Sequence, residues 1–185
     1  MSPAIDAAYV ATISSAFPDL AGWFEELRPR SDLLLRPLRP EEVTDRYVAG
    51  INDPAVSRFL VSARSGRLTR ESIVAFVQRD WQACDAVLFG VWVKGAHCGN
   101  VRLHAVTAQT AQIGIAIFDT AVQGRGVGAA VLAAVAHHAV DNLRIARIIA
   151  GIDRNNVASR KAFAAVGFRC VADDPAAEGS IWHYP

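Results

Sequence analysis

The sequence predicts one α/β domain in which helices cover a mixed β-sheet. Three observations indicate this class: short apolar runs separated by turns in residues 87–117, alternating helix-like and strand-like segments after residue 124, and a length of 185 residues. Strands followed by strand–helix alternation are typical of a mixed sheet covered by helices. A chain of this length that is 52% hydrophobic can bury a core without disulfides or metals.

Residues 1–31 differ in pattern from the rest of the chain. Their apolar positions recur every three to four residues, which predicts a helical extension interrupted by Pro18. We therefore expect an extension, 1–31, and a domain, 32–185. The extension is expected to lie against the domain or against a partner subunit, so a homodimer is left open. The repeating positions are Tyr9, Ile13, Phe17, Leu20, Trp23 and Phe24.

The first part of the domain reads as a strand followed by two helices. The strand is expected at 33–38, and Pro40-Glu41-Glu42 opens a helix, because proline and acidic residues suit a first turn. Asn52-Asp53-Pro54 ends that helix. Thr69 suits the N-cap of the second helix, whose apolar stripe is Ile73, Phe76, Val77 and Trp81.

The rest of the domain alternates between strands and helices. Strands are predicted at 87–93, 101–106 and 113–117, with a turn at 94–99. A helix rich in Ala and Val then runs to about Leu143. A strand at 147–152 and a helix at 156–166, stopped by Gly167, follow it. Two closing strands are expected at 168–171 and 181–184.

Composition excludes several classes of function. The 19 Lys+Arg and 18 Asp+Glu give a net charge of +1, which provides no overall field for nucleic acid or a membrane surface. Cys84, Cys98 and Cys170 lack the spacing of a zinc or redox motif, so we expect no metal and free thiols in a reducing compartment. No signal peptide and no apolar run of about 20 residues is evident, which predicts a cytoplasmic protein.

The strongest chemical feature is Gln123-Gly124-Arg125-Gly126-Val127-Gly128, between a predicted strand and a predicted helix. Glycines let a backbone approach a ligand closely, and the N–H groups of a helix N-terminus favour an anion. A phosphate or pyrophosphate suits such a loop, and the Arg125 side chain would add positive charge. The alternative is a turn that serves only to pack strand against helix.

Two common phosphate motifs fit this loop poorly. A Walker A loop is excluded, because Gly128 is followed by Ala129-Ala130 instead of Lys and Ser or Thr. The dinucleotide fingerprint matches Gly124, Gly126 and Ala129. However, its acidic residue is expected about 20 residues further on, whereas Asp153 lies 29 residues after Gly124. Only 57 residues follow Gly128, which is too little chain for the remaining units of that fold.

Two segments together resemble the GCN5-related N-acetyltransferase (GNAT) family. Gln123, Gly126 and Gly128 match its Arg/Gln-x-x-Gly-x-Gly/Ala signature, and Asn156-Val157-Ala158-Ser159 with Gly167-Phe168 resembles a second element of the family. The resemblance covers residues 32–185, and Arg36-Pro37-Leu38 suits the branch of ribosomal-protein and amino-sugar acetyltransferases. It implies a largely antiparallel central sheet with one splayed parallel strand pair, flanked by helices.

The resemblance also implies acetyl-CoA as co-substrate. Its pyrophosphate would lie on the loop, and its pantetheine arm would pair like an extra strand between residues 113–118 and 147–152. Capping of the helix at 156–166 explains Asn156 as well as a coenzyme contact does, and explains Ser159 less well than a coenzyme contact does. The coenzyme-binding residues implied are Ile117, Phe118, Gln123, Gly124, Arg125, Gly126, Val127, Gly128, Ala129, Asn156 and Ser159.

The resemblance leaves the general acid and the general base unassigned. A backbone N–H near Ile117 or Phe118 is the expected donor to the oxyanion. Many family members have a tyrosine as general acid where this chain has Phe163; Tyr47 and Tyr184 remain as unplaced alternatives. His104 and Asp119 are weak candidates for the general base, each also explained as a strand or turn residue, and a chain of water molecules is a further alternative.

These inferences predict an N-acetyltransferase that transfers acetyl directly to a primary amine in a ternary complex. Residues 52–60 and 99–103 favour an amino sugar, often nucleotide-linked, as the acceptor. A protein N-terminus, as in ribosomal-protein acetyltransferases, is one alternative. A binding module that senses acyl-CoA without turnover is the other, and Phe163 is its main support.

Overall fold

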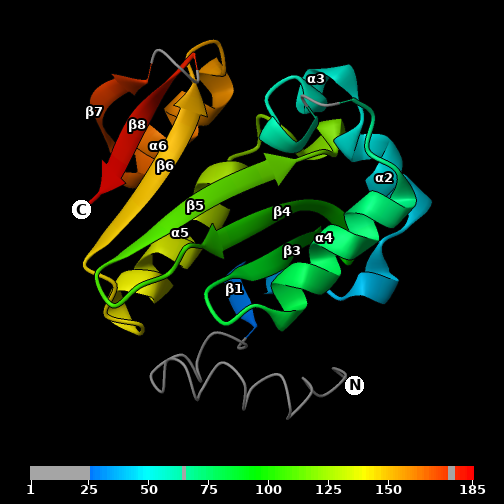
Figure 1. The fold of residues 1–185 in the computed structure, drawn as a ribbon, viewed down its shortest axis with the longest axis horizontal. Helices are drawn as coiled ribbons and strands as arrows, with labels where there is room; N and C mark the ends of the chain where they lie inside the picture. Colours follow the sequence, from blue (N-terminus) through cyan, green and yellow to red (C-terminus); the bar gives the residue numbers. More distant parts are fainter. Residues whose placement is uncertain (1–25, 64–65, 175–177) are drawn as a thin grey trace.

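The computed structural model describes residues 26–63, 66–174 and 178–185. Its eight strands form one sheet in the order β1-β2-β3-β4-β5-β6-β8-β7, and β5 with β6 is its one parallel pair (Figure 1). This confirms the expected mixed α/β class. The elements are β1 (Leu27–Arg30), β2 (Leu33–Pro37), η2 (Pro40–Glu42), α2 (Asp45–Ile51), α3 (Pro54–Ser57), η3 (Val61–Ala63), α4 (Arg70–Gln82), β3 (Val87–Val93), β4 (Ala96–His104), β5 (Thr110–Ile117), η4 (Thr120–Val122), α5 (Val127–Asp141), β6 (Arg147–Asp153), α6 (Val157–Val166), β7 (Arg169–Asp174) and β8 (Gly179–Tyr184).

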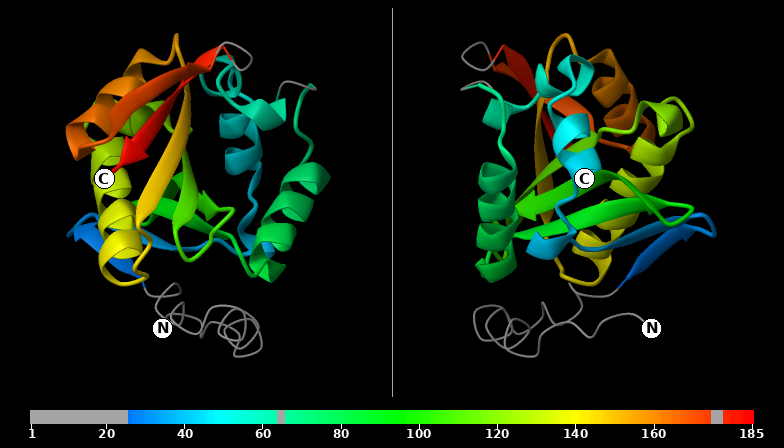
Figure 2. Two further views of the ribbon diagram at one scale, coloured as in Figure 1. Left: turned by 60° about the vertical axis from the view of Figure 1, so that its left-hand side comes forward. Right: turned by 90° about the vertical axis from the view of Figure 1, so that its right-hand side faces the viewer.

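Two layers of helices cover opposite faces of the sheet (Figure 2). The apolar side of α5 packs on one face and buries Val131, Leu132 and Val135 completely. On the other face, α2, α3 and α4 close a second core. An ion pair with a buried carboxylate ties α4 to this face, because Arg102 of β4 donates to both carboxylate oxygens of Asp80, at 2.5 and 2.8 Å.

The parallel strands β5 and β6 are paired along only part of their length. Thr110–Gln112 pairs with Arg147–Ile149, and no pairing continues beyond those residues, although β6 stays paired with β8 to its end. Figure 1 shows the two strands together at their N-terminal ends and apart toward their arrowheads. The expected splayed parallel pair is therefore confirmed.

The β3–β4 hairpin is tighter than predicted. Lys94 and Gly95 form a two-residue turn with φ of 50° and 79°, so β4 begins at Ala96 and the expected turn at 94–99 is wrong. The positive φ at both turn residues matches the twist of the flanking strands. A bulge where Val91 and Trp92 face Gly99 and His97 then turns the His97 side chain toward the α2/α4 face.

Two other expectations need correction. Residues 27–30, assigned to the helical extension, form β1 and pair antiparallel with β2, and the rest of the extension, 1–25, lies outside the described residues. The helix expected at Pro40 is only a 3-10 turn, closed by the Glu42 carboxylate on the Arg39 N–H; α2 begins at Asp45 after the N-cap Thr44. Among the described residues, no helix is both long and apolar enough to span a membrane.

Candidate functional site

The glycine loop, residues 123–128, ends in the N-terminus of α5. Gly124 and Gly126 have φ of 73° and 72°, left-handed values that favour glycine, and Gly126 is the helix N-cap. The Ala130 N–H makes the first helical bond, to the Gly126 carbonyl, so the N–H groups of Val127, Gly128 and Ala129 precede the helical ladder. The N-terminus of a 15-residue helix thus offers three adjacent donors.

Space is open over this loop. A Cβ built on Gly124, Gly126 or Gly128 would meet nothing within 4 Å. The glycines are therefore not explained by close packing of the strand against the helix. Open space, donor N–H groups and a positive helix end together suit a phosphate.

Two side chains fasten the loop to the sheet. The Gln123 side-chain amide donates to the Ile117 carbonyl at 2.9 Å, and the Arg30 guanidinium donates to the Arg125 carbonyl at 3.3 Å. Gln123, predicted to contact the coenzyme, thus uses its side chain to hold the loop against the end of β5. The Arg125 side chain is exposed at the loop.

Beside the loop, β5 turns backbone groups toward the opening. Antiparallel strands bond through alternate residues, and the Phe118 N–H donates to the Cys98 carbonyl of β4 at 3.0 Å. Ile113, Ile115 and Ile117 therefore turn their N–H and C=O groups away from β4, and Ile115 and Ile117 lie beyond the pairing with β6, which ends at Gln112 and Ile149. Phe118 is wrong as the oxyanion donor, because its N–H is already bonded within the sheet; the Ile117 N–H faces the opening.

The second predicted coenzyme segment lies at the start of α6. The Asn156 side chain accepts the Ser159 N–H at 3.0 Å, so the capping function of Asn156 is confirmed. Ser159 lies in the first turn of the helix. Phe163 is only 2% exposed and packs edge-on against Phe168 in the core under α5 and α6.

The two candidate bases do not meet at the opening. His104 is paired with Gln112, in the region where β5 and β6 are still joined, and is about 17 Å along β4 from Gly99. Burial, with the Arg102 charge, lowers the pKa of His104. Asp119 follows β5 directly, but one carboxylate oxygen caps η4 through the Ala121 N–H and the other is 2.5 Å from Arg46.

Of the two unplaced tyrosines, one lies near the end of β5 and the other does not. Tyr184 of β8 is opposite Ile148, at the joined end of β6, and contacts Phe168. Tyr47 of α2 is buried and stacks on Phe118, with ring centroids 5.1 Å apart. Burial raises the pKa of Tyr47 to about 12.

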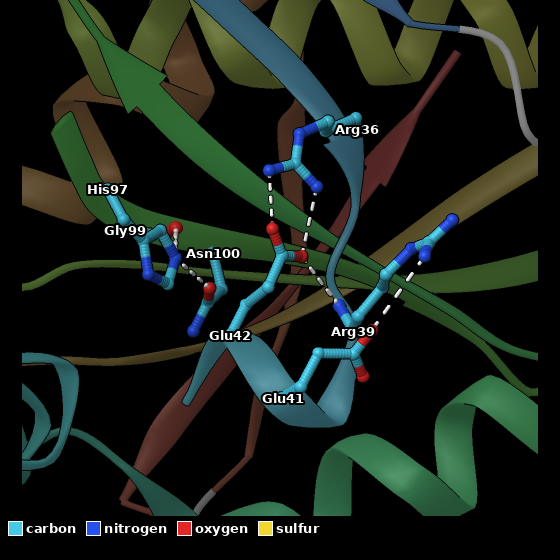
Figure 3. Close-up of polar contacts among 7 residues, drawn as sticks. All are labelled: Arg36, Arg39, Glu41, Glu42, His97, Gly99 and Asn100. Carbon is cyan, nitrogen blue, oxygen red and sulfur yellow. Dashed lines mark hydrogen bonds and ion pairs between the residues drawn. The ribbon is translucent and has the colours of Figure 1, made fainter. Parts of the chain in front are cut away.

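Sequence reasoning missed a group of side chains around Tyr47, here named the His97 cluster: Tyr47, Trp92, His97, Asn100 and Phe118. The His97 ring stacks on Trp92 at 4.9 Å and meets the rings of Tyr47 and Phe118 edge-on, each at 5.1 Å. Its Nε2 lies 3.0 Å from the Gly99 carbonyl and 2.9 Å from Asn100 Oδ1 (Figure 3). Burial lowers the pKa of His97, so the imidazole is neutral at pH 7.

An ion pair between Arg36 and Glu42 lies beside the cluster (Figure 3). The Arg36 guanidinium covers the Trp92 ring at 4.0 Å and donates to both Glu42 oxygens, at 2.9 and 2.5 Å. Burial raises the pKa of Glu42, but the hydrogen bonds from Arg36 and the Arg39 N–H outweigh burial and leave that pKa lowered. Glu42 is therefore a charged, engaged carboxylate at pH 7.

Comparison with solved structures shows the same fold in acetyltransferases. The Salmonella typhimurium enzyme that modifies the N-terminal serine of ribosomal protein L7/L12 is 18% identical; the match covers 86% of this chain and 98% of that one, with a TM-score of 0.75. A structure of RimL, a ribosomal L7/L12 α-N-protein acetyltransferase, with coenzyme A has 18% identity, coverage of 86% and 97%, and a TM-score of 0.77. Mycobacterium smegmatis RimJ, in complex with CoA-disulfide, has 21% identity, coverage of 88% of each chain and a TM-score of 0.72.

Sequence comparison assigns the family. No curated protein matches the chain. The model of the acetyltransferase (GNAT) domain matches residues 32–169, about three quarters of the chain, which include the glycine loop, β5 and β6. With this match and the splayed β5–β6 pair, the chain belongs to the GNAT family of acetyltransferases.

Proposed function

We propose that this acetyltransferase transfers the acetyl group of acetyl-CoA to the α-amino group of a protein N-terminus. The observation that carries the coenzyme part is the opening between β5 and β6 directly beside the glycine loop. The loop N–H groups suit the pyrophosphate, and the outward N–H and C=O groups of Ile115 suit an amide of the pantetheine arm. The Ile117 N–H is the donor that we assign to the oxyanion.

The remaining predicted coenzyme contacts stay part of this proposal. Arg125 would add charge beside the phosphates, and Gln123 would act by holding the loop. Asn156 and Ser159 lie at the start of α6, directly after β6, which is the other strand of the opening. Phe118 would contribute through its side chain on the α2/α4 face.

The chemistry of the site supports an α-amine as acceptor. An ammonium must lose a proton before it attacks, and α-amino groups have pKa values near 7.7–8.0, compared with about 10.4 for lysine. The carboxylates of Asp119 and Glu42, near the end of β5 and the His97 cluster, are held by Arg46 and Arg36. A site whose carboxylates are engaged in this way suits an amine that is already partly neutral at pH 7 to 8.

Two of the proteins with similar structures act on the N-terminus of a ribosomal protein. This supports a protein N-terminus as the acceptor. The amino-sugar acceptor favoured by the sequence patterns at 52–60 and 99–103 has no comparable support. We therefore rank the protein N-terminus above it.

The test is to incubate the protein with acetyl-CoA and a panel of acceptors. Release of the coenzyme thiol and the mass of each product are measured. Peptides with free N-termini and varied first residues are compared with the same peptides N-terminally blocked but carrying lysine, and with amino sugars. We expect mass gain only in the free peptides. Acetylation of the amino sugars alone would overturn the acceptor assignment, and tight coenzyme binding without any product would favour an acyl-CoA sensor.

A further inference from the structure

The two ring nitrogens of His97 differ in their hydrogen bonding. His97 Nδ1 is buried and has no hydrogen-bond partner among the residues that the structure describes. An unpaired buried acceptor is destabilising, and native structures contain few of them. In Figure 3 this nitrogen points away from Gly99 and Asn100, which both bind the other ring nitrogen.

The hydrogen bonds assign the tautomer. The Gly99 carbonyl can only accept, so Nε2 carries the proton and donates to it. Asn100 agrees with this, because its Oδ1 also faces Nε2, and Asn100 is hydrogen-bonded to the Tyr47 hydroxyl. Nδ1 therefore carries a lone pair and is a proton acceptor.

The surroundings keep that acceptor neutral. Trp92 of β3, Tyr47 of α2 and Phe118 enclose the ring on three sides. The charged groups that face it are Glu42 of η2 and Arg36 of β2, and these are bonded to each other. Tyr47 stays protonated at neutral pH, since its pKa is raised to about 12.

The position of His97 matches the place where an acceptor would arrive. The glycine loop leads into α5, which covers one face of the sheet, and His97 contacts Phe118 on the other face. Phe118 directly follows Ile117, whose N–H faces the opening. Helix α2 lies close to this point, because a Cβ on Gly50 would be 2.6 Å from the Phe118 ring.

We propose that His97 accepts, at Nδ1, the proton that the acceptor ammonium loses before it attacks the thioester. This inference rests on the proposed acetyl transfer to an amine. The ammonium would contact Nδ1 directly or through one water molecule. The donor N–H of the substrate would complete the hydrogen bonding of Nδ1. The other titratable groups in this region, Asp119 and Glu42, are engaged in ion pairs, and burial raises the pKa of the Cys98 thiol to about 11.

The reaction moves one proton to Nδ1 and a second proton to sulfur. One N–H bond of the ammonium breaks and its proton goes to Nδ1, which makes the imidazolium. The freed lone pair forms the N–C bond to the thioester carbonyl, and the C–S bond then breaks with its electron pair on sulfur. The second proton lost by nitrogen goes to the thiolate, and the imidazolium returns its proton to solvent.

His97→Gln separates proton acceptance from structure, because its amide can still donate toward Gly99 but has no lone pair at the Nδ1 position. His104→Gln, on the same strand but outside the opening, is the matched control. We expect kcat/KM of His97→Gln to fall on the order of 10²-fold at pH 6.5. The loss should shrink about tenfold or more by pH 8.5, because the α-amine is then mostly neutral without help.

The wild-type pH profile gives a second measurement in case His97→Gln does not fold. With His97 as acceptor, the acid limb of kcat/KM reports an ionisation below 6.5 and is the same for two peptides whose α-amines differ in pKa. An acid limb of kcat/KM that shifts with the α-amine pKa of each peptide overturns the proposal. A loss of kcat/KM in His97→Gln that is equal at all pH values overturns it as well. A wild-type protein that acetylates no amine overturns both this proposal and the proposed function.

Discussion

The glycine loop leads into the helix on one face of the sheet, the His97 cluster lies on the other face, and the two are built in different ways. The loop offers backbone N–H groups from one continuous segment, and its residues need only glycine and a helix start. The cluster is made of side chains from α2, β3, β4 and the end of β5 that only the folded sheet brings together. We infer that the loop accounts for recognition of the coenzyme, and that the cluster accounts for the acceptor chemistry.

The largest expected effect tests how tightly the His97 cluster is packed. A Cβ on Gly90 would lie 2.2 Å from the Trp92 ring, which stacks on His97 and under Arg36. Gly90→Ala should lower the free energy of unfolding by about 1–3 kcal/mol, since the indole must move. Urea denaturation measures the change.

Gly114→Ala on the exposed side of β5 is the matched control for stability. A Cβ there meets nothing within 4 Å, so its free energy of unfolding should change by less than about 1 kcal/mol. Equal effects of the two substitutions would show that Trp92 is not packed against the Gly90 backbone as described.

The next effect tests the loop. Gly126→Ala puts a side chain at φ 72°, which costs about 1–2 kcal/mol and disturbs the N-terminus of α5. We expect the KM for acetyl-CoA to rise about tenfold, equal to 1.4 kcal/mol of binding. Gly95→Ala, at φ 79° in the β3–β4 turn, carries the same strain and should leave KM unchanged. A rise in both variants would mean that the effect comes from general loss of stability.

The smallest effect is the pH dependence of stability. The folded-state pKa values of His97 and His104 are lowered, mainly by burial, so the unfolded state binds protons more readily. Their contribution to stability is complete above the unfolded pKa of about 6.5 and is lost as pH falls through the folded values. The urea midpoint should decline from pH 6.5 to 5, and less so in His97→Gln or His104→Gln. An unchanged decline in both variants would contradict the burial of the two rings.

The difference between the two regions also explains what sequence reasoning could predict. Glycines, helix caps and apolar alternation are local signals, and they predicted the loop, the cap Thr69, and β3 to its ends, and left capping open as one of two readings of Asn156. The strand β1 was missed because its residues, Leu-Arg-Pro-Arg, carry little apolar signal and gain order only by pairing with β2.

The His97 cluster depended on non-local geometry. His97 precedes a β-bulge, but the sequence pattern predicted a turn over residues 94–99. Gly99 is the only local signal for the bulge. Which face His97 occupies is set by that bulge, and its neighbours are set by strand register and by the approach of α2. For the same reason His104 and Asp119 looked equally suitable as bases, although pairing and ion pairs place them in other roles.

The most direct test of the account is amide hydrogen exchange of the protein with and without coenzyme A. We predict slower exchange at the outward-facing amides of Ile115 and Ile117 and at the helix-start amides of Val127, Gly128 and Ala129. The Phe118 amide, already bonded to Cys98, should be protected in both states. Coenzyme binding that leaves the first five amides unchanged would contradict the assignment of the β5–β6 opening and the glycine loop as the coenzyme site.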